Sequence, residues 1–136
     1  MFVIEKPLPA ISEDAAPYWE GCRQGEIRVQ RCTGCRHVRW PPSVLCPKCL
    51  ADGTEWVALS GRGTVYSFIV VHRPQHPAFF ADAPYNVAII ELTEGPRLHS
   101  SIVDCPPDAI QVGMPVEVVF DRVNDEVTLP RFRPYR

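Results

Sequence analysis

Four cysteines arranged in two pairs are the residues of this sequence whose type and spacing could do chemistry. Two residues separate Cys32 from Cys35, two separate Cys46 from Cys49, and ten lie between the pairs. Each Cys-x2-Cys segment forms a knuckle that directs two sulfurs at one point, and two knuckles complete a tetrahedral thiolate site. The pattern predicts that these four cysteines bind one metal ion, and zinc is the expected ion.

Two other interpretations of the cysteines compete with a zinc site. Iron suits tetrahedral sulfur ligands as well as zinc does, and it would make the chain an electron carrier of the rubredoxin type. The four thiols could also be free or joined in disulfides, although a reducing cytoplasm disfavours disulfides. With four protein ligands the site has no open position for water or substrate, so we expect a structural metal.

Short elements must position the cysteines. We expect an N-terminal helical arm over residues 1–25, with a helix over 13–24 that Gly25 ends. A zinc ribbon over 26–59 would have one strand before the first cysteine pair and another after the second. About 30 residues bury too little apolar surface to fold alone, so metal binding would supply the missing free energy.

The remaining residues, 60–136, have an all-β pattern. A long loop over 73–84 contains three prolines together with Phe79 and Phe80. Five strands with a helical turn at 105–113, between the third and the fourth, match an OB-fold barrel, and a five-stranded sandwich fits the spacing almost as well. The predicted strands cover residues 64–72, 86–93, 98–103, 116–121 and 127–132.

Composition and charge exclude some classes of protein. The chain is 46% hydrophobic and 22% charged, as soluble globular proteins are. No apolar run approaches the ~20 residues that span a bilayer, and the N-terminus lacks a signal-peptide pattern, so we expect a cytoplasmic protein without a membrane partner. Residues 20–50 hold six basic and two acidic residues, whereas residues 51–136 hold eleven acidic and seven basic ones.

No residue can be assigned a catalytic role from the sequence. The phosphate-binding, nucleophile-elbow and metalloprotease motifs are missing. Cys22 and Cys105 stand outside the two pairs, and free cysteines of this kind are usually small buried hydrophobes. His72 and Arg73 lie where a predicted strand enters the long loop. They could contact a ligand or a partner there, although a solvated surface pair is the commoner outcome.

Several motifs, in this order along the chain, resemble those of one family. The matching segments are Gln30–Cys35, Cys46–Cys49, Gly61–Ser67, Glu94–Leu98, Gly113–Val116 and Leu129–Pro134, together with the pair Pro41-Pro42. The sequence resembles the zinc-ribbon plus OB-fold acyl-CoA-associated proteins, known as domain of unknown function 35. The resemblance extends from about Tyr18 to Pro134, and the four cysteine positions match without departure.

The resemblance implies a mainly β fold with an N-terminal helical arm, a rubredoxin-like zinc ribbon and a C-terminal five-stranded OB-fold barrel. It also implies a non-catalytic accessory subunit that docks on a thiolase-like, aldolase-like or hydratase acyl-CoA enzyme and helps form or stabilise its acyl-CoA site. Acyl-CoA is then the expected ligand, and Arg31, Arg36 and Arg39 are candidates to attract its phosphates. Exposed aromatic residues would anchor the partner, namely Tyr18, Trp19, Phe79 and Phe80.

A single-stranded nucleic-acid binder is the alternative function, because OB-folds and zinc ribbons both occur in that class. Such a protein needs a basic groove with interleaved aromatic residues. The acidic excess in residues 51–136 disfavours this reading.

Overall fold

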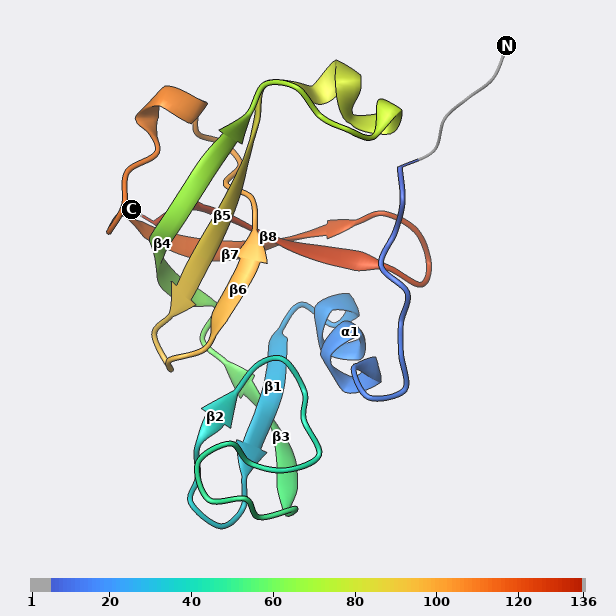
Figure 1. The fold of residues 1–136 in the computed structure, drawn as a ribbon, viewed down its shortest axis with the longest axis vertical. Helices are drawn as coiled ribbons and strands as arrows, with labels where there is room; N and C mark the ends of the chain where they lie inside the picture. The colour runs from blue at the N-terminus through green and yellow to red at the C-terminus, as the bar shows by residue number, and fades with distance from the viewer. Residues whose placement is uncertain (1–5, 136) are drawn as a thin grey trace.

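A three-stranded ribbon and a five-stranded sheet lie at opposite ends of the molecule, with one helix beside their junction (Figure 1). The computed structural model describes residues 6–135. In chain order the elements are α1 (Ala16–Arg23), β1 (Ile27–Cys32), β2 (Val38–Arg39), β3 (Thr54–Leu59), β4 (Arg62–Val71), η1 (Pro77–Asp82), β5 (Tyr85–Leu92), β6 (Arg97–Ser100), η2 (Pro107–Ala109), β7 (Pro115–Arg122) and β8 (Thr128–Pro134). Within the described residues, none of the helices has the length and apolar character needed to cross a membrane.

Helix α1 is shorter than the 13–24 segment predicted from the sequence. Residues 13–15 form a turn instead, in which the Ala15 N–H donates to the Ser12 carbonyl oxygen (3.2 Å). The helix begins at Ala16 because Pro17, which lacks an N–H, suits the first helical turn. It ends before Gly25, whose φ of 82° is the left-handed conformation that commonly terminates helices.

The ribbon sheet has the strand order β2-β1-β3, with β1 in the centre. All six residues of β1 pair with β3, from Ile27 opposite Leu59 to Cys32 opposite Thr54. The apolar residues of β1 alternate with polar ones, and Ile27 and Val29 are fully buried. The two-residue strand β2 was not expected from the sequence; it pairs Arg39 with Gln30.

The larger sheet has the order β6-β5-β4-β7-β8 and curls into a half-barrel. The chain leaves β6 at Ser100, earlier than the predicted end of the third strand at Val103. It then makes a single parallel bridge from Ile102 to Phe132 of β8, which joins the two edges of the sheet. The five strands and this closure confirm the OB-fold barrel and exclude the sandwich.

One hydrophobic core joins the helix, the ribbon and the barrel. It contains Cys22 of α1, Ile27 of β1 and, from the barrel, Ile90 and Phe132, all of which are buried. Tyr18 also belongs to this core with 5% of its surface exposed, so its prediction as an exposed anchor was wrong. The error arose because one amphipathic helical face can pack equally well on a partner or on the chain's own ribbon.

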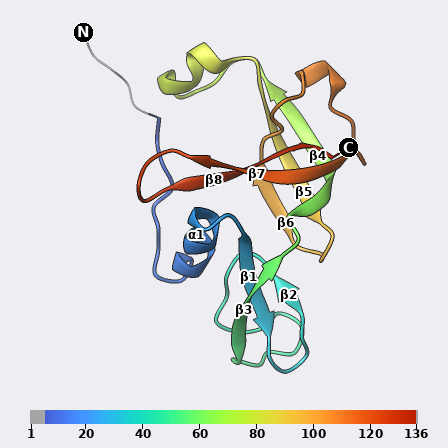
Figure 2. The same cartoon turned by 180° about the vertical axis from the view of Figure 1, so that it is seen from behind.

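The N-terminal arm lies along the barrel (Figures 1 and 2). Its Lys6 forms an ion pair with Asp82 of η1, with 2.6 Å between Nζ and Oδ2. The same Nζ lies 5.7 Å from the ring centroid of Phe79. The arm therefore connects the start of the described chain to the long loop between β4 and β5.

Candidate metal centre

Two knuckles with the same backbone hydrogen bonds carry the four cysteines. In the first, the Arg36 N–H donates to the Cys32 carbonyl (2.9 Å) and the Cys32 N–H donates to the His37 carbonyl (2.9 Å). In the second, the Leu50 N–H donates to the Cys46 carbonyl (2.8 Å) and the Cys46 N–H to the Ala51 carbonyl (2.9 Å). The two turns are therefore equivalent around a common centre.

Each knuckle ends on a residue with left-handed backbone. Arg36 has a φ of 67° and Leu50 a φ of 63°, at the position that follows the second cysteine of each pair. This conformation costs a non-glycine residue of the order of 1 kcal/mol. Its occurrence at both equivalent positions shows that the turns, rather than local preference, determine the backbone there.

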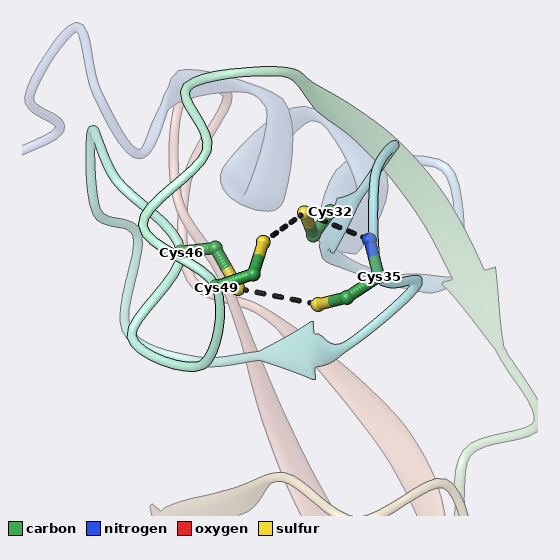
Figure 3. A group of neighbouring side chains, drawn as sticks. All are labelled: Cys32, Cys35, Cys46 and Cys49. Atoms are coloured by element: carbon green, nitrogen blue, oxygen red, sulfur yellow. Dashed lines mark hydrogen bonds between the residues drawn. The ribbon is translucent and has the colours of Figure 1, made fainter.

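The four sulfurs meet inside these turns. Figure 3 shows the side chains of Cys32, Cys35, Cys46 and Cys49 pointing toward one another. Cys32 Sγ lies 3.5 Å from Cys49 Sγ, and Cys35 Sγ lies 3.6 Å from Cys46 Sγ. All four sulfurs lie within 4.8 Å of one another. Tetrahedral Zn–S bonds of about 2.3 Å place sulfurs about 3.8 Å apart, so the cluster fits one such ion.

Backbone N–H groups in the knuckles favour the thiolate forms that bind metals. The Cys35 N–H donates to Cys32 Sγ (3.4 Å), and mainly for this reason the pKa of Cys32 falls from 9.0 to about 6. Burial acts to raise the pKa of Cys46, but the N–H groups of Cys49 and Lys48 outweigh it and hold that pKa below its usual value. Because the thiolate is the metal ligand, the protein favours the binding form of both residues. At Cys35 the His37 N–H acts to lower the pKa, but burial and the three neighbouring thiols outweigh it and raise that pKa to about 11.

A buried polar network holds the loop between the knuckles. Arg39 is 5% exposed, and its Nε donates to Ser43 Oγ (2.9 Å) while its Nη2 donates to Thr54 Oγ1 (2.7 Å). The Ser43 N–H donates to Gln30 Oε1 (2.8 Å). The network connects β1, β2 and β3 to the segment that leads into Cys46. It could not be anticipated from the sequence, where Arg39 looked like a surface cation.

The predicted anion contacts do not form one cluster. Arg31 is engaged in an ion pair with Glu55 (2.7 Å), and Arg39 is buried in the ribbon network. Arg36 is exposed on the first knuckle. His72 and Arg73 are also exposed, but they follow β4 at the end of the molecule away from the ribbon (Figure 1).

Among the clefts of the described chain, two lie where the barrel meets the helix or the ribbon. One, of about 570 Å³, lies against β5, β6 and β8 and is lined partly by Trp19 of α1 and Phe79 of η1. The other, of about 930 Å³, lies between the ribbon and the turn that joins β5 to β6. Its lining includes Lys48 and Arg97. Arg97 was not among the anion contacts predicted from the sequence, because it is distant in sequence from the cations of the ribbon.

Comparison with known proteins identifies both halves of the chain. Residues 19–55 match the model of the ChsH2 rubredoxin-like zinc ribbon domain, and residues 56–121 match that of the ChsH2 C-terminal OB-fold domain. A DUF35 domain-containing scaffold protein of Methanothermobacter thermautotrophicus is 44% identical over 98 residues, which cover 71% of this chain and 72% of that protein.

A longer relative and a solved structure match most of this chain. The probable enoyl-CoA hydratase alpha subunit of Thermomonospora curvata is 45% identical over 129 residues, which are 95% of this chain but only 40% of that protein. The chain thus spans less than half the length of this relative. A chain of the structure described as Ltp2-ChsH2(DUF35) aldolase superposes with a TM-score of 0.85 at 45% identity, covering 93% of this chain and 98% of that chain. From its two matched domains and these relatives, the chain belongs to the DUF35 family and has the zinc ribbon and OB-fold of ChsH2.

Proposed function

We propose that this chain is a non-catalytic accessory subunit that docks on an acyl-CoA enzyme of the aldolase, thiolase or hydratase type and helps form or stabilise its acyl-CoA site. The observation that carries the proposal is the overlap with the chain of the Ltp2-ChsH2(DUF35) aldolase structure. That chain is matched over 98% of its length at 45% identity, and this similarity supports the same kind of assembly for the present chain.

Cys32, Cys35, Cys46 and Cys49 would hold one Zn²⁺ in this subunit. The sulfur cluster, the equivalent knuckles and the lowered thiol pKa of Cys32 support this assignment. Bound zinc supplies folding free energy, because four thiolates close its coordination sphere. The ribbon then keeps the shape that α1 and the barrel pack against.

The surface of the described chain suits a subunit better than an independent protein. Large apolar side chains stand in water on both the ribbon and the barrel, among them Val44 (82% exposed), Leu50 (71%) and Phe80 (57%). A partner that covers these side chains would gain free energy from their burial. Of the four aromatic residues proposed as anchors, Phe80 is exposed, whereas Trp19 and Phe79 are half-buried.

The nucleic-acid alternative receives less support from the barrel. OB-folds bind oligonucleotides on the face of their second and third strands, which here are β5 and β6. The cleft on that side is shared with Trp19 of α1 and with Phe79. Arg131, a cation of this cleft, is already paired with Asp121 (3.1 Å). The described residues of this face do not form an open basic groove of the kind that single strands need.

Affinity purification of the tagged chain from its native cell tests the proposal. We expect one acyl-CoA enzyme to co-purify in a fixed ratio and to remain bound through size-exclusion chromatography. Zinc should be present at one equivalent per chain in the same fractions, and the colourless protein would exclude iron. Recovery of the chain alone, or bound only to nucleic acid, would overturn the proposal.

A further inference from the structure

Strand β4 has neighbours on both sides along only part of its length. Residues 62–64 pair with β7, and Val65 exchanges hydrogen bonds with the segment before β7, accepting from the Gly113 N–H (2.7 Å) and donating to the Met114 carbonyl (3.0 Å). A β-bulge follows at Tyr66, where the register with β5 shifts. Beyond the bulge, Ser67 to Val71 pair with β5 alone. The second half of β4 is therefore an edge of the sheet.

Apart from the bulge at Tyr66, this edge lacks the features that usually prevent edge strands from pairing. Residues 66–71 read Tyr-Ser-Phe-Ile-Val-Val, without a charge, a proline or a glycine. Among the described residues, none donates or accepts a backbone hydrogen bond on the side of this stretch that faces away from β5. Ile69 is 60% exposed and Tyr66 is 47% exposed. A long, uncharged and apolar edge of this kind is a template for an additional strand.

The ribbon edge offers a contrast within the same chain. Strand β3 also pairs on one side only, with β1. This strand contains Glu55, whose Oε1 forms an ion pair with Nε of Arg31 at 2.7 Å. A charged residue on an edge strand disfavours pairing with another chain. The distal half of β4 is thus the less protected of the two edges.

We propose that residues 66–71 of β4 accept an extended segment of the acyl-CoA enzyme as an additional strand of the barrel sheet. The inference rests on the proposed function and names the docking surface that it requires. Free N–H and C=O groups along the edge would supply main-chain hydrogen bonds, which give affinity in this mode of recognition. Ile69 lies opposite Val87 on one face of the sheet, so apolar or β-branched partner side chains would pack there.

The charges at the two ends of the strand favour the enzyme over a second copy of this chain. Arg62 begins β4 and Arg73 follows it, and the segment between them contains no acidic residue. Antiparallel pairing of two copies about residues 66–71 would place Arg73 of one copy opposite Thr64 of the other, two positions from Arg62, at both ends. Like charges across a strand pair are destabilising. A partner segment flanked by carboxylates would instead complement both arginines.

Hydrogen exchange on the purified complex tests this inference. In the free chain, the amides of residues 66–71 that face away from β5 should exchange rapidly, and in the complex we expect them to exchange at least about tenfold more slowly. Ile69→Lys places a charge on the edge and should weaken the complex by about tenfold or more. Val123→Lys, in the turn between β7 and β8, is the matched control, and it should leave affinity unchanged. Zinc content and circular dichroism should be unaltered in both variants, because both side chains are exposed.

Four outcomes would overturn the inference. A complex that forms without new protection at 66–71, or that tolerates Ile69→Lys, would refute this docking surface and leave the proposed function intact. Protection in the isolated chain together with a dimeric mass would assign the edge to a second copy. Failure to obtain any complex would reject the proposed function, and the docking surface with it.

Discussion

The rings of Tyr18 and Trp40 stack with their centroids 4.0 Å apart and their planes inclined by 30°. Tyr18 belongs to α1, and Trp40 directly follows β2 in the loop between the two knuckles. The stack therefore connects the helix to the segment that leads into Cys46. Since the helix also packs on β7 and β8 of the barrel, within one shared core, the metal ribbon and the barrel are stabilised together.

Removing this stack should destabilise the whole chain. We predict that Tyr18→Ala lowers the free energy of unfolding by about 3 kcal/mol, because a buried ring is deleted and leaves a cavity. Phe80→Ala, at a ring that is 57% exposed, should change the free energy of unfolding by less than about 1 kcal/mol. Urea denaturation followed by tryptophan fluorescence measures both variants. Equal losses in the two variants would contradict the structural role of Tyr18.

Loss of one knuckle sulfur should remove the metal and unfold the ribbon. We predict that Cys46→Ser yields a chain with far less than one zinc, because three thiolates leave the site open and weaker. Cys105→Ser is the control. Because Cys105 lies outside the cluster, this variant should retain one zinc per chain. Elemental analysis gives the zinc content, and circular dichroism reports the fold. A fully folded Cys46→Ser chain would show that the ribbon does not depend on the metal.

The barrel closure depends on one buried amide. Asn86 Nδ2 donates to the Ile102 carbonyl (2.9 Å), and the Ile102 N–H donates to Asn86 Oδ1 (2.7 Å). We predict that Asn86→Ala lowers the free energy of unfolding by about 3 kcal/mol, because two backbone groups of Ile102 would remain buried without partners. Ser67→Ala, on the exposed part of β4, is the control with a small expected effect. Thermal denaturation of the zinc-loaded proteins compares them, and a stable Asn86→Ala variant would be contrary to this reading.

Stability should fall at alkaline pH because of a buried thiol. Burial raises the pKa of Cys22 from 9.0 to about 12. Above pH 9 the unfolded chain releases this proton while the folded chain still holds it, so unfolding becomes easier as the pH rises from about 9 to about 12. Below pH 9 both states keep the proton and the effect disappears. Cys22→Ala should show a shallower decline over this range in urea denaturation at several pH values, and identical slopes would contradict the prediction.

The sequence predicted the elements that depend on local pattern and missed those that depend on distant contacts. The cysteine spacing anticipated the two knuckles that bring Cys32 and Cys49 to 3.5 Å. The strand predicted over residues 86–93 corresponds to β5, in which Ala88, Ile90 and Leu92 are buried. In contrast, the bonds between Asn86 and Ile102 join residues whose types do not suggest a pair, and they become visible only when the barrel closes.

Cations were the least predictable part of the candidate site. An arginine in a short ribbon can point to solvent or complete a polar network, and its neighbours in sequence do not distinguish the two. Arg36 is exposed to solvent, whereas Arg39 is buried and completes a polar network. Arg97 reaches the ribbon cleft from the barrel and also lies 3.8 Å from the ring centroid of Tyr66, a position that requires the full fold.

The most direct test of the accessory role measures acyl-CoA turnover by the chain alone, by its co-purified enzyme alone, and by the two together. We predict no turnover by the chain alone, joint elution of the two proteins from a size-exclusion column, and higher activity or thermal stability of the enzyme in the mixture. Separate elution at micromolar concentration with an enzyme that is fully active alone, or turnover by the pure chain, would contradict the central claim.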